Sequence, residues 1–288
     1  MKTKLIGLLV CMLLIATTLV SATSLKKENM NTTSYIVDVP TWETGDSWIY
    51  NTHIYTAASP NVTDELVIDG RGELLLEVSD DTGEYYTLQG TMKSLVGTIE
   101  APGAIGFHLT RFNSYESTIK IQKSNLSVID HDSTLKAIVL LTLGPIPLPI
   151  PLQMQYRLIT TFGPMWNLLP FPLTDGQTGE YDNITLQQEY DVTMFWGLIP
   201  VDNGINSEGW IGAAPYNCTL ESVTVPAGTY DAYNVSCDLY FGLGHDWYLT
   251  YYSDEVGNIV KCAYNIDALT GNTYYLYEME LLSTTYIP

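Results

Sequence analysis

The sequence is poor in basic residues, with 12 Lys and Arg against 32 Asp and Glu, which gives a formal net charge of −20. An acidic balance of this size repels nucleic acids and anionic membranes. No nucleic acid is expected as a partner, whereas association with a membrane or the cell surface stays open. The same charge could attract cations, although a solvated acidic surface is the simpler interpretation.

The sequence also lacks the motifs of common catalytic sites. It contains no Gly-x-Ser-x-Gly, no His-Glu-x-x-His and no Cys-x-x-Cys. Residues 45–48, Gly-Asp-Ser-Trp, are similar to the nucleophile block of one class of esterases, but no histidine follows an Asp by three residues. We interpret Gly45-Asp46 as a turn, and we expect neither an enzyme nor a cofactor.

Metal-binding patterns are weak as well. Candidate ligands occur in three polar runs: Asp130-His131-Asp132, Asp202-Asn203-Gly204 with Glu208, and Ser253-Asp254-Glu255. None matches the spacing of a known metal-binding loop, and His245, next to Asp246, is interpreted as structural. We therefore predict no metal site.

Helical periodicity is absent over any useful length after the first residues. Short runs rich in Tyr, Val and Thr alternate with Gly, Asp and Asn turns, a pattern typical of antiparallel all-β proteins. We expect one strongly curved sheet or half-barrel, with two sandwich-like domains meeting near 165–180 as the alternative. Strands are predicted at 65–79, 84–99, 104–112, 115–122, 125–130, 183–196, 208–225, 229–242, 246–252, 258–266 and 273–284. A short helix at 132–142 competes with an apolar strand.

The amino-terminal residues resemble an export signal. Lys2 and Lys4 precede an apolar run from Leu5 to Val20, and small residues end at Ala22. We predict a signal peptide at 1–22, a polar tether at 23–40 and a β domain at 41–288, with possible related halves at 41–165 and 166–288. The protein would be extracellular or at the cell surface. An uncleaved anchor is the alternative, because residues 5–22 reach the lower limit of a membrane span.

Cysteine is scarce, with four residues, of which Cys11 lies inside the predicted signal. The turn at Pro226-Ala227-Gly228-Thr229, closed by Val225 and Tyr230, would place Cys218 opposite Cys237 in an antiparallel pair. That geometry suits a disulfide, so we predict a Cys218–Cys237 bond and a free Cys262.

Asn-x-Ser/Thr sequons occur six times, which makes a surface glycoprotein plausible if the source glycosylates Asn. The candidate sites are Asn31, Asn61, Asn125, Asn183, Asn217 and Asn234.

Residues 135–173 are strongly apolar, but prolines interrupt every window long enough to be a membrane helix. In residues 145–152, prolines alternate with Ile146, Leu148, Ile150 and Leu152. An extended chain would put the prolines on one face and remove the N–H donors from one edge. We predict an edge strand whose Ile/Leu face covers apolar surface, with a polyproline-type loop or a ligand or membrane flap as alternatives.

Several turn and strand signatures resemble those of uncharacterised exported β-proteins of archaea and bacteria. They are Trp42-x-x-Gly-Asp-x-Trp48, Phe171-Pro172-Leu173, the Val-Pro-Ala-Gly-Thr-Tyr within residues 221–233, and Tyr252-Ser-Asp-Glu-Val-Gly257. The chain departs from the pattern at Tyr181, near a position where Trp is expected. Those proteins are in turn similar to the half-barrels of lipoprotein carriers, a resemblance that implies a fold rather than an activity.

Two functions are consistent with these observations. In the first, the protein binds an apolar small molecule or a lipid on the concave face of its sheet. In the second, it is a structural or interaction glycoprotein of the cell surface with no small ligand.

Overall fold

The computed structural model describes residues 36–57, 67–101, 106–143, 146–166, 169–182, 184–211, 214–239, 244–268 and 274–288. The predicted signal peptide therefore lies outside the described residues, as does most of the tether. Within these ranges the chain forms sixteen strands: β1 (Ile36–Val37), β2 (Ser47–Ala57), β3 (Val67–Thr82), β4 (Tyr85–Ala101), β5 (Gly106–Gln122), β6 (Val128–Leu143), β7 (Ile146–Trp166), β8 (Leu173–Thr174), β9 (Thr178–Tyr181), β10 (Ile184–Met194), β11 (Ile199–Ile211), β12 (Ala214–Val225), β13 (Gly228–Leu239), β14 (Gly244–Ser253), β15 (Asn258–Ala268) and β16 (Tyr274–Thr284).

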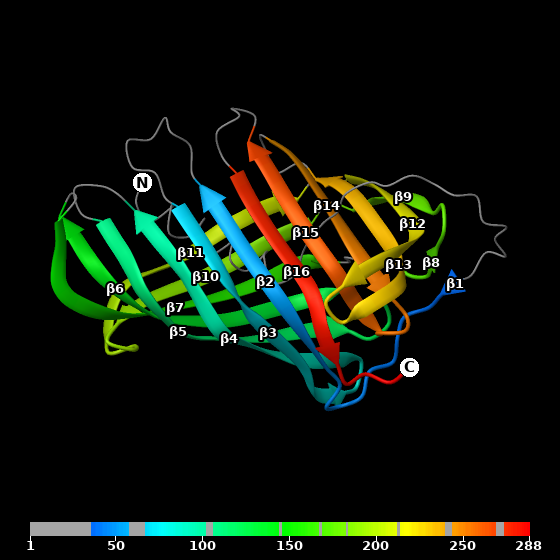
Figure 1. Ribbon diagram of the computed structural model, residues 1–288, viewed down its shortest axis with the longest axis horizontal. Helices are drawn as coiled ribbons and strands as arrows, with labels where there is room; N and C mark the ends of the chain where they lie inside the picture. The colour runs from blue at the N-terminus through cyan, green and yellow to red at the C-terminus, as the bar shows by residue number, and fades with distance from the viewer. Residues whose placement is uncertain are drawn as a thin grey trace.

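Fourteen of these strands form one antiparallel sheet that curves around a common interior (Figure 1), which confirms the predicted fold class. Its order is β11-β10-β7-β6-β5-β4-β3-β2-β16-β15-β14-β13-β12-β9, and β1 pairs separately with β8. Both proposed halves of the chain thus contribute to the same sheet. Among the described residues no helix is long and apolar enough to cross a bilayer.

The two edges of the sheet approach each other through one two-stranded ribbon. Tyr181 pairs with Ala214 in the β9–β12 ladder, and Ile184 pairs with Ile211 in the β10–β11 ladder, so both ladders share one register. Only two residues lie between the paired positions on each side, which limits their Cα separation to about 11 Å. Because β10 also pairs with β7 and β12 also pairs with β13, this ribbon requires the sheet between them to curve strongly.

Alternation along each strand separates an apolar inner face from a polar outer face. In β3, Leu74, Leu76 and Val78 are buried, whereas Glu73 before them and Glu77 among them are exposed. This period of two is the one that a half-buried strand requires. The largest fully buried side chains of the described residues lie on the inner face: Trp48, Tyr50, Tyr233, Tyr252, Leu74 and Leu88.

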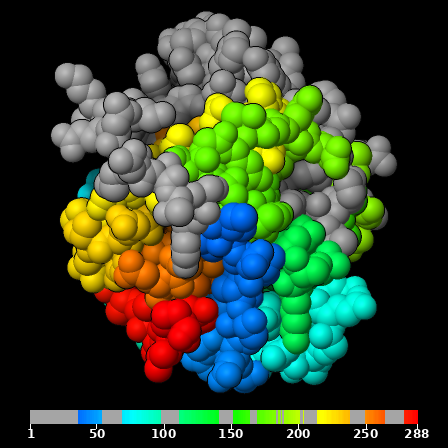
Figure 2. All heavy atoms as spheres, turned by 90° about the vertical axis from the view of Figure 1, so that its right-hand side faces the viewer, coloured from blue at the N-terminus to red at the C-terminus, as the bar shows by residue number. Residues whose placement is uncertain are grey.

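Aromatic side chains close one end of the sheet, which we call the tryptophan end. Trp42 donates its indole N–H to the carbonyl of Gly257 at 2.7 Å, and Trp48 donates to the carbonyl of Val256 at 2.9 Å. The two rings are 5.1 Å apart, and Tyr86 accepts a hydrogen bond from the Trp42 amide at 3.0 Å. In Figure 2 the amino-terminal residues (blue) run across the middle of this end, between the carboxyl terminus (red) and the β3–β4 region (cyan).

The Gly45-Asp46 turn at this end is structural, as expected. Gly45 has φ +101°, a left-handed conformation that favours glycine. The Asp46 carboxylate accepts a hydrogen bond from the Glu43 amide at 2.7 Å, and the amide of Gly45 donates to the carbonyl of Val78 at 2.9 Å. The turn therefore aims Trp42 and Trp48 into the core.

Several predicted boundaries differ from the structure. Residues 132–142 lie within β6 and are not helical, because their alternate residues pack on the inner face. The two strands expected at 104–112 and 115–122 are one strand, β5, with local register shifts. The single strand expected at 208–225 is divided between β11 and β12.

Candidate ligand-binding site

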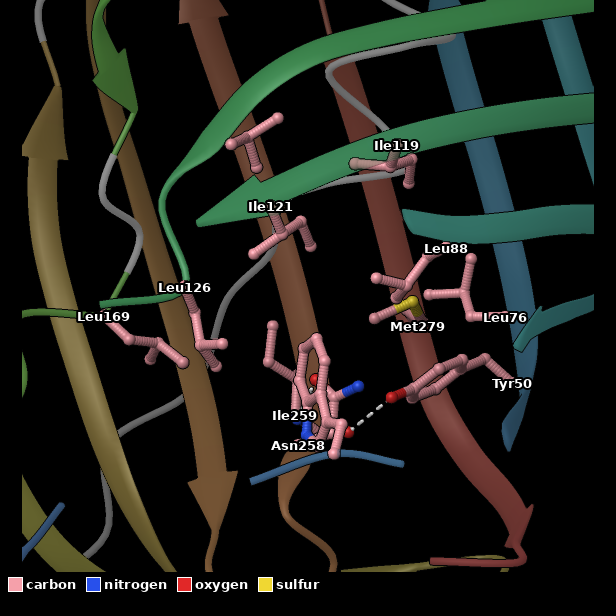
Figure 3. A pocket seen from close by; sticks show the side chains of 12 residues that line it. Tyr50, Leu76, Leu88, Ile119, Ile121, Leu126, Leu169, Asn258, Ile259 and Met279 are labelled. Atoms are coloured by element: carbon pink, nitrogen blue, oxygen red, sulfur yellow. Dashed lines mark hydrogen bonds between the residues drawn. The ribbon is translucent and has the colours of Figure 1, made fainter. Parts of the chain in front are cut away.

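A small cavity lies on the inner face of the sheet (Figure 3). It is bounded by the strands of the sheet and by two segments that cross this face, one containing Trp42 and the other Leu169. Its volume is about 70 Å³. The lining side chains come from seven neighbouring strands, β2 to β6, β15 and β16, from the β5–β6 connection and from both crossing segments: Trp42, Tyr50, Leu76, Leu88, Ile119, Ile121, Leu126, Val128, Leu169, Asn258, Ile259 and Met279.

The polar groups in this lining bond to protein atoms. The Tyr50 hydroxyl donates to the carbonyl of Ile259 at 2.9 Å, and the Asn258 side-chain oxygen accepts from the amide of Ile259 at 2.8 Å. Burial raises the pKa of Tyr50 well above its usual value, so this hydroxyl remains neutral. The cavity surface is therefore suited to hydrocarbon.

Residues 169–177, which we call the strap, cross the inner face between β7 and β9. Leu169 and Leu173 are buried in the core, and the Phe171 ring meets the Tyr252 ring edge-on at 5.1 Å. The side chain of Gln177 makes two hydrogen bonds within the strap. Its Nε2 donates to the carbonyl of Pro170 at 3.0 Å, and its Oε1 accepts from the Thr174 amide at 3.1 Å. The strap forms one wall of the cavity through Leu169.

Hydroxyl and imidazole groups interrupt the apolar inner face beside the cavity. His131 on β6 is paired directly with the lining residue Ile119 on β5, and Ser117 is paired with Ser133 one position along the same face. His131 is 1% exposed, and within the described part of the chain neither its Nε2 nor the Ser117 hydroxyl has a hydrogen-bond partner. Burial lowers the pKa of His131 to about 4, so its imidazole is neutral at pH 7.

Such atoms are unusual, because most buried polar side-chain atoms have a hydrogen-bond partner. Space for the Ser117 hydroxyl comes from Gly90 on β4, where a Cβ atom would lie 2.2 Å from the Ser117 oxygen. The inner face thus offers neutral hydrogen-bonding groups next to hydrocarbon.

The Cys218–Cys237 disulfide predicted from the sequence is wrong. The turn contains two residues rather than four, because Val225 pairs with Gly228. Cys218 consequently faces Val235, and the two cysteines are diagonal neighbours, at a separation of roughly 7–8 Å that a disulfide does not span. None of the described cysteines is in a disulfide, and burial raises the pKa of the Cys218 thiol to about 12.

The three residues of Asp130-His131-Asp132 do not converge. His131 points to the inner face, whereas Asp132 is on the outer face, where its carboxylate accepts a hydrogen bond from Arg157 Nε at 3.0 Å. Asp254 and Glu255 belong to the β14–β15 turn. The structure does not describe the side chains of Asp202, Glu208, His245 and Asp246. No cluster of His, Cys, Asp and Glu suited to a metal occurs among the described residues.

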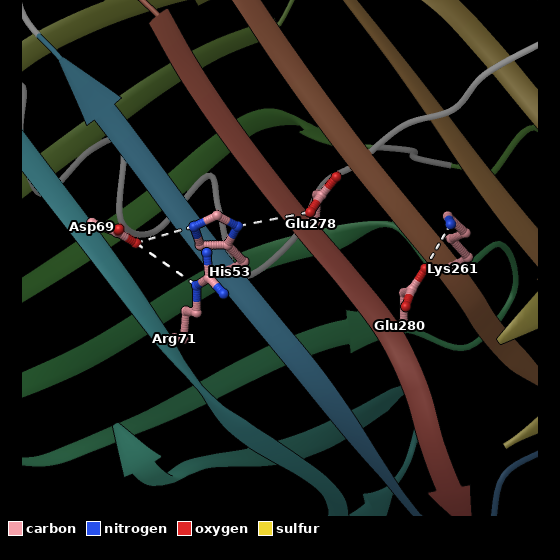
Figure 4. Close-up of polar contacts among 6 residues, drawn as sticks. All are labelled: His53, Asp69, Arg71, Lys261, Glu278 and Glu280. Carbon is pink, nitrogen blue, oxygen red and sulfur yellow. Dashed lines mark hydrogen bonds and ion pairs between the residues drawn. The ribbon is translucent and has the colours of Figure 1, made fainter. Parts of the chain in front are cut away.

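Ion pairs on the outer face form a second polar group (Figure 4). His53 lies between two carboxylates, with Nε2 3.1 Å from Asp69 and Nδ1 3.7 Å from Glu278. Lys261 pairs with Glu280 at 2.6 Å. These side chains are partly exposed, so each pair adds little stability, and they face away from the cavity.

Of the six sequons, three can be placed. Asn217 is exposed on β12. Asn125 is half-buried and accepts a hydrogen bond from the Ser127 amide at 3.0 Å, and the half-buried Asn234 donates to Glu221. Asn31, Asn61 and Asn183 lie outside the described residues.

The proline-rich residues are extended, at the start of β7. Their described pairing is with β6 alone, from Ile146 opposite Leu143 to Leu152 opposite Val139, whereas pairing with β10 begins at Met154. The register skips around Pro149, which cannot donate a hydrogen bond. Leu152 is half-buried and packs against the core. The side chains of Ile146, Leu148 and Ile150 lie outside the described ones, so the cover or flap stays a prediction.

The cavity residues were not identified from the sequence. Their signal was the alternation of Leu74, Leu76 and Val78, and of Ile119 and Ile121, which indicated strands with one apolar face. That pattern does not show which apolar side chains meet a cavity and which pack tightly.

The chain was compared with family models, curated proteins and solved structures, and none of them matches it.

Proposed function

We propose that this protein binds a molecule with an apolar chain on the inner face of its curved sheet and catalyses no reaction on it. The observation that carries the proposal is the cavity between sheet and strap, whose lining is almost wholly hydrocarbon. Ligand sites of this kind combine apolar walls with a few polar groups that orient the ligand. Here His131 and Ser117 are the candidate polar groups.

The cavity is smaller than the roughly 150 Å³ that admits benzene in an engineered protein core. A lipid-sized ligand would therefore displace the strap, which forms one wall and carries Leu169. Backbone hydrogen bonds between the strap and β12 hold the strap in its observed place, from the Gly176 amide to the Cys218 carbonyl at 2.9 Å and from the Cys218 amide to the Gln177 carbonyl at 2.8 Å. We expect weakening of these bonds to speed ligand entry.

The resemblance of the turn signatures to exported β-proteins, and through them to lipoprotein carriers, supports the same proposal. It includes export through the predicted signal peptide, so the ligand would be met outside the cytoplasm. Lipids and other hydrocarbon chains are the matching chemical class.

Binding is tested with the purified protein and a fluorescent fatty acid. We expect saturable binding that is displaced by an unlabelled fatty acid. Leu76→Phe adds volume to the cavity wall and should abolish this binding while the protein remains folded. Leu158→Phe is the matched control, because Leu158 belongs to a separate buried cluster with Tyr156, Tyr190 and Val192. Absence of saturable binding, or equal loss in both variants, would refute the proposal.

One observation favours the second candidate, an interaction glycoprotein of the cell surface. Asn217 belongs to the sequon Asn217-Cys218-Thr219 and is exposed on the outer face, so its side chain is accessible for modification. Mass spectrometry of protein isolated from its source separates the two candidates. A co-purifying lipid supports the ligand-binding protein, whereas glycosylated Asn217 without any lipid supports the glycoprotein.

A further inference from the structure

The hairpin between β10 and β11 ends in an exposed apolar tip, formed by Phe195, Trp196, Leu198 and Ile199. Phe195 is 43% exposed, Leu198 80% and Ile199 51%. Most of the other exposed large apolar residues that the structure describes stand singly, such as Val96 on β4 and Ile287 near the carboxyl terminus. Single exposed apolar residues are normal, whereas a contiguous group usually marks an interaction site.

The conformation of the tip is uncommon for its residues. Phe195 and Trp196 both have φ +53°, and Gly197 has φ +97°. Large side chains rarely adopt positive φ values, because Cβ then crowds the backbone. The amide of Phe195 donates to the carbonyl of Gln153 on β7 at 2.7 Å, which ties the tip to the neighbouring strand. The sheet therefore holds the aromatic residues at its margin.

Charge is absent from the tip and from the neighbouring parts of β6 and β7. No charged residue occurs in residues 192–201, and none occurs in residues 137–156 of β6 and β7, although the chain as a whole carries a net charge of −20. These two stretches are neighbours, because the sheet order is β11-β10-β7-β6.

The border of this uncharged region is aligned across the four strands. Arg157 on β7 pairs with Asp191 on β10, and Asp202 on β11 pairs with Val192 one position further. Lys136 on β6 pairs with Gln155. Charged side chains thus resume at nearly the same level on each strand, as they do where a protein leaves the apolar part of a bilayer.

We propose that this tip inserts into the interfacial layer of a lipid bilayer that carries little negative charge. The exposed apolar area of its side chains is on the order of 300 Å², well below the ~800 Å² per partner of a stable protein interface. Insertion into a bilayer needs no such area. Trp at the margin of an apolar group is typical of the membrane interface, and the acidic chain excludes strongly anionic lipid.

This inference rests on the hairpin tip and its charge-free border, and it is independent of ligand binding in the cavity. A protein with both properties would receive or deliver an apolar molecule at the bilayer surface. Either property can fail in experiment without the other.

The test uses the full chain and phosphatidylcholine vesicles whose acyl chains are brominated, which quench nearby tryptophan fluorescence. Residues 5–20 could hold the chain on vesicles by themselves, so the readout is local quenching of Trp196. We expect Trp196→Phe to lower the quenching, and the difference between the natural chain and this variant isolates Trp196 from the other five Trp residues, of which Trp42 and Trp48 are buried at the tryptophan end. Phosphatidylglycerol vesicles with the same bromination should quench less at low salt.

A double variant, Phe195→Ser with Leu198→Ser, should raise the lipid concentration for half-maximal quenching at least about tenfold, since it removes most of the exposed hydrocarbon. Ile287→Ser is the matched control, because Ile287 is 85% exposed but lies near the carboxyl terminus, and it should change nothing. Circular dichroism checks that each variant is folded. Quenching that is absent, that is unchanged in Trp196→Phe, or that Ile287→Ser reduces equally would overturn the proposal. So would a dimer in lipid-free solution that the double variant dissociates, since the tip would then contact a second copy.

Discussion

The buried imidazole of His131 makes the stability of this protein depend on pH in a predictable direction. His131 is 1% exposed, and burial lowers its pKa from 6.5 to about 4, partly opposed by the nearby Asp132 carboxylate. In the unfolded chain the imidazole takes up a proton as the pH falls through 6.5, whereas in the folded chain it does so only near pH 4. Stability contributed by neutral His131 is therefore complete above pH 6.5 and is lost as the pH falls toward 4.

The magnitude follows from the size of the shift. A difference of one pKa unit corresponds to 1.36 kcal/mol, so the free energy of unfolding should fall by about 3 kcal/mol between pH 7 and pH 4 through this residue alone. That is a large part of the stability of an ordinary domain.

Urea unfolding at pH 7 and pH 4, for the natural chain and for His131→Leu, isolates this contribution. Carboxylates titrate in both proteins, so their effects cancel in the difference. The difference in unfolding free energy should move by about 3 kcal/mol in favour of the variant as the pH falls. At pH 7 the leucine should be tolerated, because it replaces a buried Nε2 that has no partner among the described residues.

Ser133→Ala is the control, since Ser133 is a buried neighbour on β6 that does not titrate. Its effect on stability should be the same at both pH values. Parallel pH profiles of the natural chain and His131→Leu would show that the imidazole is hydrated or already charged in the folded protein, and would refute the reasoning.

Three further predictions concern the architecture. Gly97→Ala should destabilise the protein by about 1–3 kcal/mol, because the new Cβ would lie 2.1 Å from a backbone oxygen of β3. A Cβ at Gly70 would have no atom within 4 Å, so Gly70→Ala should cost under about 1 kcal/mol. Thermal unfolding compares the two variants, and equal losses would contradict the close approach of β3 and β4 at Gly97. Trp42→Phe should lower the free energy of unfolding by about 1–3 kcal/mol, since it leaves the buried carbonyl of Gly257 without its donor. Denaturant titration measures the loss, and an unchanged unfolding midpoint would show that the tryptophan end does not depend on this bond. Cys218 should resist maleimide at pH 8 in the folded protein and react after unfolding, because its thiol is buried and burial raises its pKa to about 12. Rapid labelling of Cys218 in the folded protein, or a disulfide found by peptide mapping, would contradict the structure.

The strands themselves could be predicted because their signal is local. Val, Thr and Tyr runs with a period of two, separated by Gly and Asp turns, indicated the all-β class and placed most strands close to their observed positions. The proline-rich start of β7 was predicted to be extended with one edge available for pairing, because the missing N–H groups follow directly from the residue type.

The register of a hairpin, in contrast, depends on the detailed conformation of its turn. A change of two residues at Pro226-Ala227 moved Cys218 from opposite Cys237 to opposite Val235, while both side chains stayed on the same face of the sheet. The sequence could therefore place both cysteines on one face but could not decide whether they would be bonded.

What the sequence by itself determined is the local chemistry: the strand pattern, the acidic outer surface, the turn at Gly45 and the uncharged run of β6 and β7. Only the tertiary structure decided which distant segments meet. It brought Leu169 of the strap to the same cavity as Leu126 and Ile259, turned His131 to the inner face and Asp132 to the outer face, and set the tip at Phe195 next to Gln153. The physical reason is that curvature, register and the crossing of the strap arise from the packing of the whole sheet, which no single stretch of residues encodes.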